Sequence, residues 1–213
     1  MAQGPDHRQP RSAAEPAARA AVQPVQRVSV VGNSGSGKST LAARIAQRIE
    51  APYVEIDALH HLPGWEERDP AELLADIERL TAADRWVVDG NYRRVVVEGP
   101  VWERADTVVW LALPRPVVMR QIVTRTVRRV VTRQELWNGN REPLANFYRW
   151  DPRRNIVRWS WANHAKYEAR YSAAAADPRF DHLRFVVLRS HADADAWLAT
   201  LTPPARPDSH PTS

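Results

Sequence analysis

The stretch G-N-S-G-S-G-K-S-T at residues 32–40 decides the expected fold of this chain. It follows the apolar run R-V-S-V-V at 27–31 and leads into L-A-A-R-I-A-Q-R-I at 41–49, whose apolar residues have helical spacing. A strand, a glycine-rich loop and a helix in this order are the context that a phosphate-binding loop needs. The residues expected to bind the phosphates are Gly32, Asn33, Ser34, Gly35, Ser36, Gly37, Lys38, Ser39 and Thr40.

The residue types of this loop have separate chemical tasks. Its glycines allow a tight backbone turn, so that successive N–H groups point into one concavity where phosphate oxygens bind. Lys38 is expected to reach the β- and γ-phosphates of ATP, and the Ser39 hydroxyl is expected to bind Mg²⁺. The chain has only 2 lysines among its 30 basic residues, so a lysine at this position favours phosphate binding over a flexible Gly/Ser turn.

Composition limits the class of protein. With 213 residues and 44% apolar content, the chain can bury one core, which we place at residues 27–201. Residues 1–26 and 202–213 lack apolar periodicity and are expected to be a disordered extension and a disordered tail. There is no cysteine, and no apolar run has the length of a membrane span. A cytoplasmic enzyme without membrane contact is therefore expected.

Two carboxylates follow apolar segments that read as the second and third strands. Asp57 comes after Y-V-E-I at 53–56, and Asp89 comes after R-W-V-V at 85–88. The expected fourth strand at 107–113 ends without an acid. Asp89 is therefore the candidate for the acid that holds Mg²⁺ beside a phosphate-binding loop. Asp89-Gly90 also suits a simple turn, which is the alternative. This role places the third strand next to the first and predicts a parallel sheet of order 2-3-1-4-5 with helices on both faces, a P-loop NTPase three-layer sandwich.

The remaining elements follow from periodicity. Helices are expected at 70–81, 116–131, 152–175 and 192–201, and a fifth strand at 184–188. The residues expected to face inward include Leu73, Leu74, Ile77 and Leu80 in the first of these helices, Met119, Ile122, Val123, Thr126 and Val130 in the second, and Trp159, Trp161 and Tyr167 in the third.

Arginines gather around a small helical insert that we expect to act as a lid, at about residues 125–151. Residues 115–170 hold 12 arginines and 1 lysine against 4 acids, a balance of +9. Spacings of three and four place Arg125, Arg128 and Arg129 on one helix face, where at least one is expected to contact phosphate rather than only solvent. Nucleotide phosphates suffice to explain this charge, and nucleic acid is the competing explanation.

The sequence resembles the adenylate-kinase-like P-loop proteins, most closely the branch known as DNA topology modulation proteins (FlaR-like). Besides the loop at 32–40, the resemblance is carried by I-D-A-L-H at 56–60, P-G-W at 63–65, R-W-V-V-D-G-N-Y at 85–92, A-D-T-V-V-W-L at 105–111 and L-R-S at 188–190. It spans about residues 25–201.

The resemblance also implies roles for individual residues. In nucleoside monophosphate kinases the acid after the third strand assists Mg²⁺ through water and an arginine four positions later holds the acceptor phosphate, positions that match Asp89 and Arg93 here. Asp57 matches the acceptor-contacting acid of shikimate- and gluconate-type kinases. Arg125 and Arg129 match the lid arginines in position.

Together these observations and the resemblance predict an ATP- and Mg²⁺-dependent kinase of the nucleoside monophosphate kinase type, which transfers the γ-phosphoryl group to an unidentified small acceptor. Lys38, Asp57, Asp89, Arg125 and Arg129 are the expected catalytic residues. Two alternatives stay open: a nucleic-acid-associated NTPase that modulates DNA topology, and an ATP-sensing module without turnover. The acceptor, the base preference and the oligomeric state are not determined by these patterns.

Overall fold

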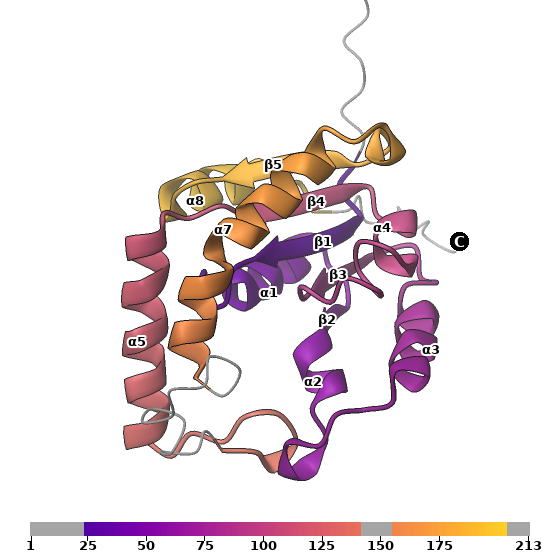
Figure 1. Cartoon of the computed structure of the whole chain (residues 1–213). Helices are drawn as coiled ribbons and strands as arrows, with labels where there is room; N and C mark the ends of the chain where they lie inside the picture. Colours follow the sequence, from indigo (N-terminus) through magenta and orange to yellow (C-terminus); the bar gives the residue numbers. More distant parts are fainter. Residues whose placement is uncertain (1–23, 142–154, 204–213) are drawn as a thin grey trace, which may run out of the picture.

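The computed structural model describes residues 24–141 and 155–203, and its centre is a five-stranded parallel sheet (Figure 1). The strands are β1 (Arg27–Gly32), β2 (Tyr53–Glu55), β3 (Trp86–Asp89), β4 (Thr107–Leu111) and β5 (Arg184–Leu188). Their order is β2-β3-β1-β4-β5, and every neighbouring pair is parallel. The predicted order 2-3-1-4-5 is confirmed. Asp89 lies beside Val30 of β1, as the argument from the metal-binding acid required.

Helices cover both faces of the sheet, which confirms the three-layer sandwich. One face packs against α1 (Lys38–Arg48) and α8 (His191–Ala199), and the other packs against α3 (Pro70–Leu80), α4 (Pro100–Arg104) and α7 (Ile156–Ala175). The remaining helical elements are α2 (Ile56–His60), α5 (Arg115–Val131) and the 3₁₀ turns η1 (Pro63–Trp65), η2 (Trp137–Gly139) and η3 (Pro178–Phe180). Helices α5 and α7 lie side by side (Figure 1).

The central strand shows why two separate cores form. Side chains alternate along a strand, so Val28 and Val30 of β1 pack towards α1 and α8, whereas Val31 packs towards α3, α4 and α7. All three are fully buried. Ser29 is also buried, and its hydroxyl accepts a hydrogen bond of 3.1 Å from the indole N–H of Trp102. The polar residue of the strand is therefore satisfied inside the core.

Several expected details are wrong. The second strand ends at Glu55, and Asp57 lies in the first turn of α2 rather than at the strand end. Leu74, Val123 and Trp161 are 36%, 41% and 56% exposed, although they were expected to face inward. In α5 the buried residues Val118, Ile122 and Thr126 follow a strict spacing of four, which makes the buried stripe narrower than predicted. The Trp161 ring lies instead under the guanidinium of Arg115, whose Cζ is 5.0 Å from the ring centroid.

The two residues before Arg27 also contact the folded chain. The backbone N–H of Gln26 donates to Asp106 Oδ2 at 3.1 Å, and its carbonyl oxygen accepts from the N–H of Trp86 at 3.0 Å. Val25 packs against the core beside α1. The other expectations for the two ends of the chain, and those for residues 142–151 of the insert and 152–154 of the helix, lie outside the described residues. Within the described residues no helix is long and apolar enough to cross a membrane.

Candidate nucleotide and acceptor site

The glycine-rich loop has the backbone that its sequence predicts. Gly35 and Gly37 have φ values of +88° and +91°, which other residues rarely adopt. Helix α1 begins at Lys38, directly after Gly37, so the loop ends at a helix N-terminus, where anions bind. A Cβ atom on Gly35 would lie 2.6 Å from Cβ of Ile122 in α5. This close approach brings the arginine-bearing helix against the loop.

Asn91 holds the start of the loop from one side. Its Oδ1 accepts a hydrogen bond from the N–H of Gly32 at 3.2 Å, and its Nδ2 donates to the Gly32 carbonyl oxygen at 2.6 Å. The hydroxyl of Tyr171 in α7 also donates to Asn91 Oδ1, at 2.9 Å. This role of Asn91 was not predicted from the sequence, although Asn91 lies close to Asp89, the predicted metal-binding acid. Its position two residues after Asp89, at the carboxyl end of β3, was the available signal.

Helix α7 holds the loop from a second side. Ser160 Oγ donates to the carbonyl oxygen of Ser34 at 2.9 Å, and Asn33 Nδ2 donates to the carbonyl oxygen of Ser160 at 2.9 Å. Asn33 Oδ1 in turn accepts from the N–H of Ser34 at 2.8 Å. Ser160 and Asn33 are both buried, so water competes little for these bonds. Nothing in the periodicity of α7 marked Ser160 as the residue that meets the loop.

Asp89 has the surroundings of a residue that would hold a hydrated metal ion. It is 2% exposed, its Oδ1 lies 3.7 Å from Lys38 Nζ, and its Oδ2 accepts from the Tyr53 hydroxyl at 3.3 Å. Oδ1 is buried without a hydrogen-bond partner. Burial raises the pKa of Asp89, against the opposing effects of the Lys38 charge and the Ser39 hydroxyl. An unpartnered carboxylate oxygen next to a hydroxyl fits Mg²⁺, which binds oxygen ligands and keeps several waters.

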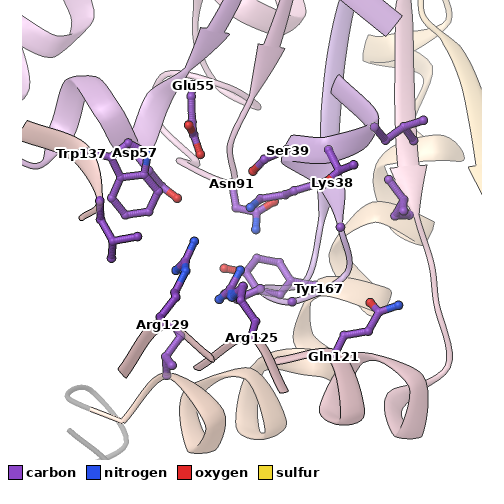
Figure 2. A pocket seen from close by; sticks show the side chains of 18 of the residues that line it. Lys38, Ser39, Glu55, Asp57, Asn91, Gln121, Arg125, Arg129, Trp137 and Tyr167 are labelled. Carbon is purple, nitrogen blue, oxygen red and sulfur yellow. The ribbon is translucent and has the colours of Figure 1, made fainter. Parts of the chain in front are cut away.

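A cavity of about 1470 Å³ opens between the loop, α2 and α5. Figure 2 shows Arg125 and Arg129 of α5 pointing into it from the side opposite Lys38 and Ser39. Arg125 also donates to Ser34 Oγ at 3.5 Å. Arg128, expected on the same face, is exposed and lines a second hollow of about 610 Å³ outside this cavity. The structure therefore brings two of the three predicted arginines to the cavity that the loop lines.

Asp57 lines the same cavity on the side away from the loop. Its Oδ1 accepts a hydrogen bond of 2.8 Å from the hydroxyl of Tyr92. Burial, followed by the negative charge of Asp57, raises the pKa of Tyr92, so this hydroxyl stays a donor. Arg93, the predicted acceptor-binding arginine, does not line the cavity. Its Nη2 and Nε lie 2.6 Å and 2.8 Å from Glu98 Oε1, outside the site.

Two asparagines of the insert bind the backbone across the cavity, and we call them the asparagine clasp. Asn138 Nδ2 donates to the carbonyl oxygens of Ala58 and His61, at 3.1 Å and 2.5 Å. Asn140 Nδ2 donates to the Leu62 carbonyl oxygen at 2.9 Å, and Asn140 Oδ1 accepts from the N–H of Trp65 at 3.1 Å. The described start of the insert therefore contacts the segment after α2 and closes that side of the cavity.

Comparison with solved structures shows the fold of the chain. No protein-family model matches it, and no curated protein matches it. A shikimate kinase from Bacteroides thetaiotaomicron is 12% identical and matches over 83% of this chain and 96% of its own, with a TM-score of 0.51. A gluconokinase from Sinorhizobium meliloti 1021 is 21% identical over 83% of this chain and 93% of its own, with a TM-score of 0.46. The chain therefore has an α/β P-loop fold of the kind found in shikimate kinase.

Proposed function

We propose that this chain is an ATP-dependent phosphotransferase that transfers the γ-phosphoryl group to a hydroxyl of a small acceptor. One observation carries the proposal. Lys38 and Ser39 of the loop face Arg125 and Arg129 across a single cavity, and Asp57 lines the same cavity at its other end. This arrangement offers a phosphate-binding side and an acceptor side with cationic side chains between them.

The phosphate side would bind the Mg²⁺ complex of ATP. The loop N–H groups and Lys38 would bind the β- and γ-phosphates, while Ser39 and, through water, Asp89 would hold Mg²⁺. The bound metal ion would neutralise charge on the phosphate oxygens. Arg125 and Arg129 would stabilise the negative charge of the group in transfer. An arginine in this role can contribute roughly 10³ to 10⁵ in rate.

The acceptor side favours a hydroxyl over a phosphate. The Tyr92 hydrogen bond fixes one oxygen of Asp57, so the carboxylate is oriented to accept a proton from an acceptor hydroxyl. The resemblance implies a nucleoside monophosphate kinase, whose acceptor phosphate Arg93 would bind. Because Arg93 pairs with Glu98 outside the cavity, the geometry gives that acceptor less support.

ATP binding and ADP release test the proposal. Lys38→Ala is expected to weaken ATP binding at least tenfold, measured by titration with a fluorescent ATP analogue, because it removes the cation at the phosphates. The chain supplies a matched control: Lys166, its other lysine, is exposed on α7, and Lys166→Ala is expected to bind ATP normally. ADP release dependent on both Mg²⁺ and an added hydroxyl acceptor supports transfer. Equal ATP affinity in the two variants would refute the assignment of the loop.

A nucleic-acid-associated NTPase is the second candidate. The observation that favours it is the second hollow, which the exposed Arg120 and Arg128 line together with Arg125 and Arg129. If these arginines bind a nucleic-acid backbone, affinity for DNA falls steeply with salt, with a log–log slope of about −0.9 per phosphate contact. If DNA affinity does not change with salt, the kinase proposal stands alone. If affinity falls steeply with salt, and Arg120→Ala and Arg128→Ala make the slope shallower, this candidate is supported.

A further inference from the structure

The acceptor half of the cavity is built around three aromatic rings, which we call the aromatic box: His61, Trp65 and Trp137. The ring centroids of His61 and Trp65 are 5.3 Å apart in an edge-on arrangement, and His61 and Trp137 stack at 5.7 Å. Trp65 and Trp137 meet edge-on at 6.4 Å. All three residues line the cavity, so the box presents ring surface to whatever enters next to Asp57.

Carboxylates lie near the aromatic box, since the charges of Asp57 and Glu67 act on His61. Glu55 lines the same cavity, and Figure 2 shows its side chain pointing into it between Asp57 and Ser39. Of the described cations that line the cavity, Arg125 and Arg129 lie opposite these three acids, and Figure 2 shows both pointing into it. Burial, above all other effects, lowers the pKa of His61, so its ring adds no positive charge at neutral pH.

This combination selects against negative charge on the acceptor. Bound ATP adds further negative charge at the other end of the cavity, so an anionic acceptor would be repelled from both sides. A cation would be attracted by the carboxylates and by the faces of the two tryptophans. Ring surface without polar donors also suits an ammonium group that carries methyl or methylene carbons.

We propose that the acceptor is an alcohol that carries a protonated or quaternary amine. Its ammonium group lies between the aromatic box and the carboxylates, and its hydroxyl lies at Asp57; this rests on the phosphoryl transfer proposed above. The hydroxyl oxygen forms a bond to the γ-phosphorus, the bond from that phosphorus to the bridging oxygen breaks, and the hydroxyl proton passes to Asp57. The products are ADP and a phosphorylated amino alcohol.

Matched pairs of acceptors test the proposal. Choline and 3,3-dimethyl-1-butanol have the same shape and differ in charge, and glucosamine, glucose and gluconate form a second set of cationic, neutral and acidic members. Binding of each is measured by calorimetry to the full chain with a non-hydrolysable ATP analogue and Mg²⁺, and turnover is measured by ADP release. We expect the cationic member of at least one set to bind at least tenfold more tightly than its neutral counterpart.

Variants of the chain test whether this half of the cavity causes the preference for a cationic acceptor. Glu55→Gln and Trp137→Leu are each expected to reduce the ratio of cationic to neutral affinity at least threefold while ATP affinity stays within twofold. Glu98→Gln is the control, because Glu98 pairs with Arg93 outside the cavity, and it should leave the ratio unchanged. An unchanged ratio in Glu55→Gln and Trp137→Leu would remove the box and the carboxylates as its cause.

The outcomes separate this inference from the proposed function. If the phosphoryl group is transferred to a neutral or acidic acceptor in preference to the cationic one, the inference is overturned and the kinase proposal is kept. The inference is also overturned, and the kinase proposal kept, if no cationic acceptor binds better than its neutral counterpart while ATP binding still depends on Lys38. If Lys38→Ala binds ATP as tightly as the parent chain does, the proposed function itself is overturned.

Discussion

The side chain of Asn91 makes two hydrogen bonds to the backbone of Gly32, one to its N–H and one to its carbonyl oxygen. Asn91→Ala leaves both backbone groups without this partner next to the phosphate site. We expect a loss of about 1–3 kcal/mol in the free energy of unfolding and at least tenfold weaker ATP binding. Urea denaturation and nucleotide titration measure the two effects.

Tyr171→Phe is the matched control for Asn91. It removes one of the donors to Asn91 Oδ1 but keeps both bonds to Gly32 and the packing of the ring. The expected loss is about 1 kcal/mol with little change in ATP binding. If this variant weakens ATP binding as much as Asn91→Ala does, the direct bonds to Gly32 are not what positions the loop.

Gly35 and Gly64 form a pair that separates steric contact from backbone strain. Both have positive φ, but a Cβ on Gly35 would lie 2.6 Å from Ile122, whereas nothing lies within 4 Å of one on Gly64. Gly35→Ala is expected to cost about 2–4 kcal/mol and to abolish ATP binding, because the loop and α5 must move apart. Gly64→Ala is expected to cost about 1 kcal/mol. Thermal unfolding of both variants at one pH measures the difference.

Asp89→Asn should stabilise the nucleotide-free protein. The raised pKa of Asp89 means that its burial cost exceeds the attraction of Lys38 and Ser39, so the carboxylate form destabilises the fold. This group's contribution to stability is present at low pH and is lost as pH rises through its raised folded-state pKa. The asparagine variant is therefore expected to be more stable by about 1–2 kcal/mol at pH 8, with the gain shrinking towards pH 4.

Urea denaturation at a series of pH values gives this difference curve. The same variant is expected to lose at least tenfold in Mg²⁺-dependent ATP affinity, because an amide replaces the carboxylate that would hold the metal ion through water. A variant that is less stable than the parent at pH 8 would show that the Lys38 attraction outweighs burial.

The asparagine clasp should slow opening of the segment after α2. Asn140 is 4% exposed and bonds to both Leu62 and Trp65, so Asn140→Ala is expected to speed amide hydrogen exchange in residues 58–67 about tenfold. Asn163→Ala is the control, since the Asn163 side chain bonds to the Trp159 carbonyl within its own helix. Equal exchange in parent and Asn140→Ala proteins would show that the aromatic contacts alone hold this segment.

The order of the sheet was predictable because chemistry and topology constrain each other. A phosphate-binding loop after the first strand needs a carboxylate from a neighbouring strand, and of the third and fourth strands only the third is followed by an acid, Asp89. The buried positions Leu41, Ala42, Ile45 and Ala46 of α1 likewise follow from regular helical spacing. These features depend on local sequence and general geometry.

Other features depend on contacts between distant residues, which no local pattern reveals. Whether Arg93 points into the cavity or pairs with Glu98 is decided by the path of the loop after β3. Trp161 read as a core residue, yet a single arginine at the start of α5 covers its ring and leaves it more than half exposed. Ser160 and Asn33 meet across 127 residues of sequence. Such pairings need the folded chain.

The asparagine clasp has a consequence for how the sequence of this segment can vary. Within residues 58–65 it bonds to three main-chain carbonyl oxygens and one main-chain N–H. Every substitution keeps these backbone groups, except that proline would remove the N–H. Substitutions of the side chains in this stretch therefore keep these four bonds, and replacing Trp65 removes only the further bond that its indole N–H donates to the Arg141 carbonyl oxygen, together with its ring contacts. Under the proposed function, substitutions of these side chains change the acceptor preference while the main-chain bonds of the asparagine clasp persist.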